Sequence, residues 1–379
     1  MSKAVMDLER IGAVLVRAPN WLGDAVMAIP ALRQLRRLFA NGRLTIVCRR
    51  PIAGLYEDEG LADEIFLTDG SSLSALIRET LALRKFSHWD LAVLLQNAMS
   101  GALLARAAGA RRVAGYPTDG RRILLRPVIP LDPEHKKRHQ VHYYLEIAGY
   151  LERMLKGPAD PDPQAITPDL HASGRDRALA AELLSNERVL APEMAAAVAA
   201  ESSVGLPNSF TPPIVALNPG ATNSRAKRWD PSRFAAVADR LAQQFGSRTI
   251  IVGAEGDRDT ATAVALAMKS PAAVLAGKTG ISALKGVLSY SSLVVSNDTG
   301  TAHLAAALQI PTVVVFGPTE DFATKPLSPS AEVVRHPVDC SPCMLRDCPI
   351  DHRCMTGVTV QQVYEVACRK LDDSSAGQA

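Results

Sequence analysis

The sequence lacks any apolar run of the roughly 20 residues that a helix needs to cross a bilayer. Its first residues also lack the apolar core of a secretion signal. From these two absences we expect a cytosolic protein. An excess of one charge is missing as well, since 42 basic residues face 39 acidic ones. The formal charge of +3 is too small to indicate a nucleic-acid partner.

Two short patterns are absent or incomplete. No GxGxxG follows the first apolar strand, which excludes the usual dinucleotide-binding fingerprint. The Cys-x-x-Cys pair of many zinc sites occurs once and not twice, although four of the six cysteines crowd together at Cys340, Cys343, Cys348 and Cys354. Their spacing leaves three interpretations open: a structural zinc or similar metal, disulfides, or unlinked packing in the loop.

The length and the patterning of the chain predict two domains. A chain of 379 residues with 47% hydrophobic residues can fill about two cores. Apolar strands alternate with helical stretches in two separate series, which predicts an α/β protein with two parallel sheets. The proline-rich residues 207–213 divide the series, so we expect domains at 1–207, ending in a helical linker, and at 208–379. We expect ligands in a cleft between their carboxyl edges, and a closing helix at 360–371 that crosses back to the first half.

The first strand, expected at residues 13–17, ends in a turn that contains Trp21, Gly23 and Asp24. A single helix is predicted from about residue 25 to residue 39, because apolar residues recur on one face. Asp24 therefore lies at the start of a helix and at the carboxyl edge of the sheet. It either caps the helix or acts as a general base.

Two loops of the second half carry groups suited to a nucleotide. Thr222, Ser224 and Lys227 follow the strand at 214–218 and offer hydroxyls and a cation to phosphate oxygens. The alternative is a solvated loop before the next helix. Glu255 follows the strand at 249–253 and is placed to accept hydrogen bonds from ribose hydroxyls. The alternative is a surface acid, with Asp257 capping the following helix.

Residues 296–303 form a polar turn between a strand and a helix. Asp298, Thr299 and Gly300 lie where a pyrophosphate would meet the helix N-terminus. Asp298 is acidic, so we expect it to orient a sugar hydroxyl, a metal or the loop. His303, on the first helical turn, is either a ligand contact or a satisfied core histidine.

A basic stretch lies at residues 103–140, where nine Lys and Arg face three acids. It predicts a basic face on the first half. That face is either a solvated surface or a contact for anions and membrane headgroups. The residues that we expect to contact a ligand of the first half are Trp21, Arg111, Arg112, Arg121 and Arg122.

These motifs resemble glycosyltransferase family nine, the ADP-heptose:lipopolysaccharide heptosyltransferases. In chain order the matching stretches are NWLGD at 20–24, NPGA at 218–221 with AKRW at 226–229, VGAE at 252–255, LAGKT at 275–279, and SNDTG at 296–300 with His303. They span nearly the whole chain. Trp21 is more similar to the heptosyltransferase II branch than to the I branch.

The resemblance implies a GT-B fold of two Rossmann-like domains with a cleft, the acceptor in the first domain and the nucleotide sugar in the second. It implies that Asp24 deprotonates the acceptor hydroxyl and that the sugar carbon inverts. The implied donor contacts are Lys227 and Thr222 with phosphates, Glu255 with ribose, Leu275 and Gly277 with adenine, and Asp298, Thr299 and Gly300 around the diphosphate and heptose. From their residue types and positions we expect Ser224 and His303 in the same donor site.

The implied reaction moves L-glycero-D-manno-heptose from ADP-heptose to a Kdo- or heptose-terminated lipid A acceptor. It implies peripheral contact with the cytoplasmic face of the inner membrane, no nucleic-acid partner, and no cofactor required for catalysis. Two alternatives stay open. One is the same fold and mechanism with another nucleotide sugar or acceptor. The other is a nucleotide-binding module without catalysis, against which the combination of Asp24, Lys227 and Glu255 argues.

Overall fold

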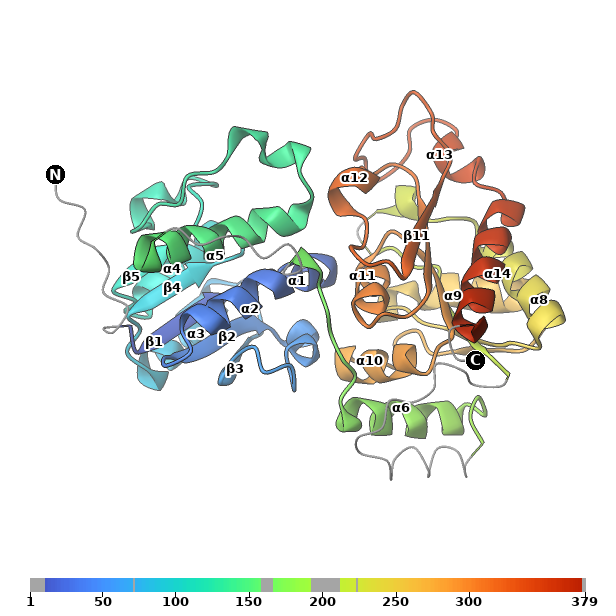
Figure 1. Ribbon diagram of the computed structural model, residues 1–379, viewed down its shortest axis with the longest axis horizontal. Helices are drawn as coiled ribbons and strands as arrows, with labels where there is room; N and C mark the ends of the chain where they lie inside the picture. The colour runs from blue at the N-terminus through green and yellow to red at the C-terminus, as the bar shows by residue number, and fades with distance from the viewer. Residues whose placement is uncertain (1–10, 71, 158–165, 192–211, 223, 377–379) are drawn as a thin grey trace. The chain divides into compact units, whose positions relative to one another are not determined.

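The protein is described here by a computed structural model that covers residues 11–70, 72–157, 166–191, 212–222 and 224–376. The chain divides into two compact units, Met1–Pro168 (unit 1) and Asp169–Ala379 (unit 2), which run from blue to green and from green to red in Figure 1. Each unit has one sheet whose named strands all pair in parallel. The predicted α/β class with two parallel sheets is therefore confirmed. Within the described ranges, no helix is long and apolar enough to cross a membrane.

Unit 1 contains a five-stranded sheet in the order β3-β2-β1-β4-β5. Buried apolar strands need cover on both faces. Helices α3 and α4 pack on the face that contains Leu15 and Leu94, while α2 and α5 pack against each other. The bounds are β1 Ala13–Arg17, β2 Arg43–Arg49, β3 Glu64–Thr68, β4 Leu91–Leu94, β5 Arg112–Ala114, α1 Leu22–Met27, α2 Ile29–Leu38, α3 Leu73–Phe86, α4 Met99–Ala107 and α5 Gln140–Lys156.

The single helix predicted for residues 25–39 is wrong. Helices α1 and α2 meet at Ala28, which ends one and begins the other. Pro30 explains the break, because it lacks the N–H that a continuous helix would donate to the carbonyl of Val26. In the first turn of a new helix that N–H is not needed. The break leaves Asp24 on a short helix directly after β1.

Unit 2 contains a six-stranded sheet in the order β11-β10-β9-β6-β7-β8. Helices α8, α9 and α14 pack on one face of it, around Leu217 and Val295. The bounds are β6 Ile214–Asn218, β7 Arg248–Ile251, β8 Ala272–Val274, β9 Leu293–Asn297, β10 Thr312–Phe316, β11 Ala331–Arg335, α6 Gly174–Asn186, α8 Pro231–Phe245, α9 Arg258–Ala267, α10 Ile281–Ser289, α11 Gly300–Ala307, α12 Asp321–Thr324, α13 Arg353–Thr356 and α14 Val360–Ala376.

Unit 2 begins earlier than the proline-rich stretch, which corrects the predicted division into 1–207 and 208–379. Helix α6 crosses α10 so closely that a Cβ on Gly286 would lie 2.0 Å from the carbonyl oxygen of Asp176. Asp176 also forms a fully buried ion pair with Lys285, at 3.2 Å. Turn-forming residues mark breaks in secondary structure, but they do not tell which unit a helix packs on. The predicted boundary at residue 207 itself lies outside the described residues.

The closing helix also packs within unit 2. Val363, Ala367 and Leu371 of α14 belong to the same core cluster as Leu217 and Val295, and α14 contacts α8 and β10. The helix is thus part of the core of unit 2, and its expected crossing to the first half stays a prediction. Its apolar face is used to cover the sheet from which it follows.

Candidate functional site

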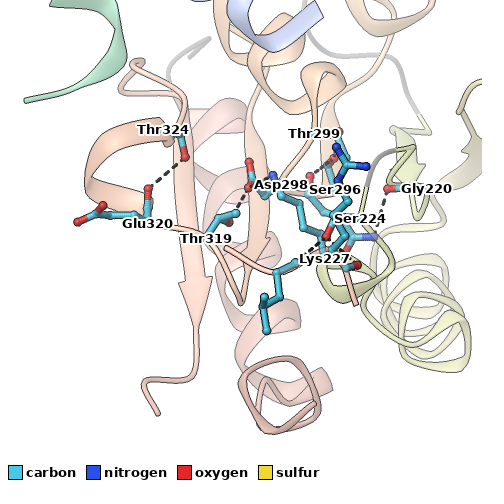
Figure 2. Close-up of polar contacts among 12 residues, drawn as sticks. Gly220, Ser224, Lys227, Ser296, Asp298, Thr299, Thr319, Glu320 and Thr324 are labelled. Carbon is cyan, nitrogen blue, oxygen red and sulfur yellow. Dashed lines mark hydrogen bonds and ion pairs between the residues drawn. The ribbon is translucent and has the colours of Figure 1, made fainter. Parts of the chain in front are cut away.

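The polar turns after β6 and β9 meet at one edge of the unit 2 sheet. Strand β6 starts the series, and the chain places β7 on one side of it and β9 on the other. In an open parallel sheet, ligands bind beyond the carboxyl ends of the strands at such a switch point. The segment after β6 brings Lys227 there, and the segment after β9 brings Asp298 (Figure 2).

Lys227 and Asp298 form an ion pair at this edge. The Nζ atom of Lys227 lies 2.7 Å from Oδ2 of Asp298, and the hydroxyl of Thr319 donates to the same oxygen at 2.7 Å. The Asp298 side chain is 6% exposed, whereas that of Lys227 is 27% exposed. The aspartate is therefore the buried partner of the pair, fixed by two donors, and the lysine side chain is the more exposed partner. Sequence reasoning did not identify Thr319, which lies in a loop without a motif.

Two asparagines hold the turns together. Asn218 donates to the hydroxyls of Ser296 and Thr299, at 2.9 and 2.7 Å. Asn297 donates to the carbonyl of Pro219 at 2.8 Å and accepts from the N–H of Trp229 at 3.0 Å. The side-chain amides thus link the two segments at the point where the backbone hydrogen bonds between β6 and β9 end. Each asparagine is the last residue of its strand. That position could have identified both as residues that join the two turns, but sequence reasoning did not use it.

The turn after β9 leads directly into α11. Thr299 is the N-cap in an extended conformation, and its side chain makes no capping hydrogen bond. Gly300 is the first helical residue, so the first N–H groups of α11 lie beside Asp298. A helix N-terminus of this kind favours anions. His303 is buried in the same helix.

A second cluster follows β7. A Cβ on Gly277 would lie 2.2 Å from Oε2 of Glu255, and Gly277 has a φ of +78°. Glycine is therefore required both for the backbone and for the approach of the carboxylate. Glu255 is exposed and pairs with Arg258 at 2.9 Å. Leu275 is fully buried. Its N–H donates to the carbonyl of Ile251 at 2.8 Å, and its carbonyl accepts from the N–H of Lys278 at 2.9 Å.

Asp257 is held beneath these turns. Its carboxylate accepts a hydrogen bond from the N–H of Ala254 at 3.2 Å. A Cβ placed on Gly220 would lie only 2.2 to 2.6 Å from the carboxylate atoms of Asp257. Arg228 approaches it at 3.5 Å. The carboxylate makes no capping hydrogen bond to α9. Asp257 takes the N-cap position of α9, as expected, but its carboxylate packs against the turn after β6 and does not cap the helix.

The segment that carries Lys227 is tied to the cysteine-rich loop, residues 340–354. The N–H of Ala226 donates to the carbonyl of Arg346 at 2.9 Å, and the ring Nε2 of His352 lies 2.5 Å from the carbonyl of Ala226. The hydroxyl of Ser224 donates to the carbonyls of Leu345 and Arg346, both at 3.3 Å. Ser224 thus contacts this loop, whereas Thr222 is exposed.

The same loop is anchored beside Thr319. The N–H groups of Cys343 and Met344 donate to the carbonyl of Pro318, at 3.0 and 2.8 Å. Ser341 donates to the carbonyl of Gly317 at 2.5 Å. The loop therefore supports the ion pair from both sides, through the Lys227 segment and through the segment that leads to Thr319.

The four cysteines of this loop are free thiols in the structure. Burial, and then the neighbouring thiols of Cys340, Cys343 and Cys348, raise the pKa of the Cys354 thiol. Among the residues that the structure describes, no three His, Cys, Asp or Glu side chains are placed to hold a metal ion. A structural zinc at the cysteines stays a prediction.

In unit 1, Asp24 lies in the first turn of α1 and is partly exposed. The N-cap of α1 is Trp21, so the alternative that Asp24 caps the helix is wrong. The hydroxyl of Tyr144, on α5, donates to Oδ1 of Asp24 at 3.0 Å. The buried Arg17 donates to Asn20 at 3.1 Å and to the carbonyl of Val47 at 2.9 Å, which fixes the turn before α1.

The predicted acceptor residues divide into two groups. Trp21, Arg111, Arg112 and Arg122 are exposed. Arg121 is fully buried, and its guanidinium donates to the carbonyls of Tyr116 and Gln96 and to Asn97. Its donors hold the loop after β5, so Arg121 is removed from the acceptor set.

The sequence model of the family described as glycosyltransferase family 9 (heptosyltransferase) matches residues 80–353. The chain is 26% identical to lipooligosaccharide heptosyltransferase 2 of Campylobacter jejuni, over 93% of this chain and 97% of that protein. It is 25% identical to lipopolysaccharide heptosyltransferase 2 of Escherichia coli, over 85% of this chain and 87% of that protein.

The structure is similar to that of the E. coli ADP-heptose lipopolysaccharide heptosyltransferase II. The TM-score is 0.77 at 23% identity, and the match covers 96% of this chain and 99% of the other. This likeness concerns the fold, and it confirms the predicted GT-B fold of two Rossmann-like units.

Proposed function

Since the chain belongs to glycosyltransferase family 9, we propose that it is an inverting heptosyltransferase of type 2, which moves L-glycero-D-manno-heptose from ADP-heptose to the inner core of lipopolysaccharide. The observation that carries the proposal is the pair of Lys227 and Asp298, held at the switch point of unit 2 beside the N-terminus of α11. Relatives named for this reaction match over most of the chain. We place the reaction at the cytoplasmic face of the inner membrane.

The donor half of the proposal rests on unit 2. When the bond between the sugar carbon and the diphosphate breaks, negative charge develops on the departing ADP. Lys227 and the first N–H groups of α11 are placed to stabilise that charge. Asp298, itself fixed by Thr319, holds the lysine amine in place. Glu255 and Gly277 meet after β7, where the ribose and adenine are proposed to bind.

The acceptor half rests on Asp24. Its carboxylate takes the proton from the acceptor hydroxyl while the hydroxyl oxygen attacks the sugar carbon from the side opposite ADP. One such displacement inverts the carbon, and a second carboxylate is needed only when a covalent intermediate is formed. Tyr144 fixes one oxygen of Asp24. Asp24 belongs to unit 1 and Lys227 to unit 2, so the proposed reaction takes one group from each unit.

The test is a donor screen with defined truncated-core acceptors, read by mass spectrometry of the product and by ADP release. We expect acceptor-dependent ADP release with ADP-heptose, and a loss of about 100- to 10,000-fold in kcat for Asp24→Asn. Preference for a UDP-sugar would contradict the donor assignment. Nucleotide binding without any acceptor-dependent release would identify a binding module. A folded Asp24→Asn variant with full turnover would remove the general base.

A further inference from the structure

Helix α3 presents a stripe of apolar side chains to solvent. Ile77 and Leu81 lie one turn apart and are 53% and 54% exposed. Ala75, Glu79 and Leu83 are buried and form the inward side of the helix. The outward side of a surface helix is normally polar. Large exposed apolar side chains at this spacing indicate an interaction surface.

The same outward side is positively charged. Arg78, Arg84 and Lys85 are exposed. The single acid of the helix, Glu79, is 8% exposed and accepts a hydrogen bond from the N–H of Asp69 at 2.8 Å. Helix α3 therefore offers solvent both apolar side chains and cations, but no carboxylate of its own.

Exposed apolar side chains also occur on neighbouring elements of unit 1. Helix α3 packs against α4, and α4 packs against the short helix Arg121–Leu124. Ile123 of that helix is 87% exposed and follows the exposed Arg122, and Leu103 of α4 is 43% exposed. We call the outward side of α3, which carries Ile77, Arg78, Leu81, Arg84 and Lys85, the apolar–basic face.

We propose that the apolar–basic face docks unit 1 on the surface of an anionic phospholipid bilayer. Exposed aliphatic side chains enter the boundary between headgroups and acyl chains, while flanking cations meet lipid phosphates. A second copy of the chain would bring the same cations to this face, and like charges repel. The positive charge of this face therefore favours an anionic lipid surface, rich in phosphate, over a second copy of the chain.

The position of this face suggests why docking would matter for the reaction, and this step rests on the proposed function. Helix α3 begins after the carboxyl end of β3, the sheet edge at which Asp24 follows β1. An acceptor anchored by lipid A presents its sugar near the bilayer surface. Docking through α3 keeps the edge that carries Asp24 close to that surface.

The experiment is vesicle flotation of the full chain, with phosphatidylcholine alone and with added phosphatidylglycerol. We expect binding only to the anionic vesicles. The double variant Ile77→Ser/Leu81→Ser loses at least about ten-fold in partition coefficient, and Arg78→Gln and Lys85→Gln each lose about five-fold. Leu266→Ser is the matched control, because Leu266 is 82% exposed on α9 of unit 2. We expect it to bind like the parent chain.

Three results would overturn the docking: equal binding to neutral vesicles, unchanged binding of the double variant, or an equal loss in Leu266→Ser. A lipid-free dimer that the double variant dissociates would assign the face to a second copy instead. Acceptor-dependent ADP release with a lipid-free acceptor separates the two proposals. The double variant should retain it, and its absence from the parent chain would contradict the proposed function while leaving the vesicle result standing.

Discussion

Tyr144 donates a hydrogen bond of 3.0 Å to Asp24, although the two residues are 120 positions apart in the sequence. Tyr144 is 4% exposed. Burial, and then the charge of Asp24, raise the pKa of the tyrosine hydroxyl well above its usual range. Since the protonated form of a phenol is the neutral form, the hydroxyl stays protonated up to strongly alkaline pH. Asp24 therefore has a permanent donor on one oxygen.

Tyr144→Phe should lower kcat and leave the KM for the donor unchanged. A hydrogen bond to a charged group contributes about 1.5–3 kcal/mol, so we expect a loss of about 10- to 150-fold. The carboxylate also loses a donor that favours its charged form, so the acidic limb of the pH–rate profile should move to higher pH. Steady-state ADP release across pH measures both effects.

Tyr143→Phe is the matched control for this prediction. Tyr143 is on the same helix and is also buried, but its hydroxyl pairs with Asn97 and not with Asp24. We expect its pH–rate profile to coincide with that of the parent chain. A similar shift in both variants would mean that the helix, and not the hydrogen bond, sets the profile.

Lys227→Gln should reduce kcat by about 100- to 1,000-fold, the range seen when one group that stabilises the leaving charge is removed. The substitution should also lower the free energy of unfolding, because the buried carboxylate of Asp298 keeps Thr319 but loses its cation. ADP release and ADP binding by calorimetry are the measurements. Lys370→Gln is the control, since Lys370 lies 3.9 Å from Glu332 and belongs to none of the matching motifs. Full activity in a folded Lys227→Gln protein would exclude its role at the diphosphate.

The sequence was sufficient to predict the strands and the turns that follow them. Apolar runs bounded by Gly, Asn and Pro identify β1, β6 and β9, and the turns at their carboxyl ends contain Asp24, Lys227 and Asp298. Parallel sheets bring such turns to one edge, so their proximity within unit 2 follows from topology alone. This is why Lys227 and Asp298 could be placed in one site before any contact was known.

Contacts between distant segments could not be predicted in the same way. Tyr144 reaches Asp24 from another helix, and nothing local to residue 144 marks it as a partner. Ser224 looked like a phosphate donor because of its residue type, but its hydroxyl is directed to the cysteine-rich loop. Arg121 looked like part of a basic face, and it is buried with its donors engaged. Residue type predicts chemical capacity, whereas packing decides its use.

Gly277→Ala should weaken donor binding by displacing Glu255. The added Cβ would lie 2.2 Å from the Glu255 carboxylate, at a φ of +78°. Gly246→Ala is the control: its φ is +64°, but a Cβ there meets nothing within 4 Å. Both variants should lose about 1 kcal/mol of unfolding free energy from the left-handed backbone. Only Gly277→Ala should also raise the KM for ADP-heptose, and an equal rise in both would contradict the role of Glu255.

The cysteine-rich loop should control the Lys227 segment through His352. Its ring nitrogen lies 2.5 Å from the carbonyl of Ala226, the residue before Lys227. The variant His352→Ala removes this hydrogen bond, which is worth about 1 kcal/mol. It should raise the KM for the donor about five-fold and leave the KM for the acceptor unchanged. ADP release with each substrate varied in turn measures the two constants.

The backbone of His352 needs its own control, because its φ is +58°. Alanine is strained there, whereas asparagine tolerates the left-handed region. His352→Asn should therefore keep the unfolding temperature of the parent chain and still raise the KM for the donor, since its shorter side chain no longer reaches the Ala226 carbonyl. His336→Ala, at an exposed histidine of unit 2, should change neither constant. If His352→Ala loses donor affinity but His352→Asn does not, backbone strain is the cause, and the loop does not position Lys227 through the imidazole.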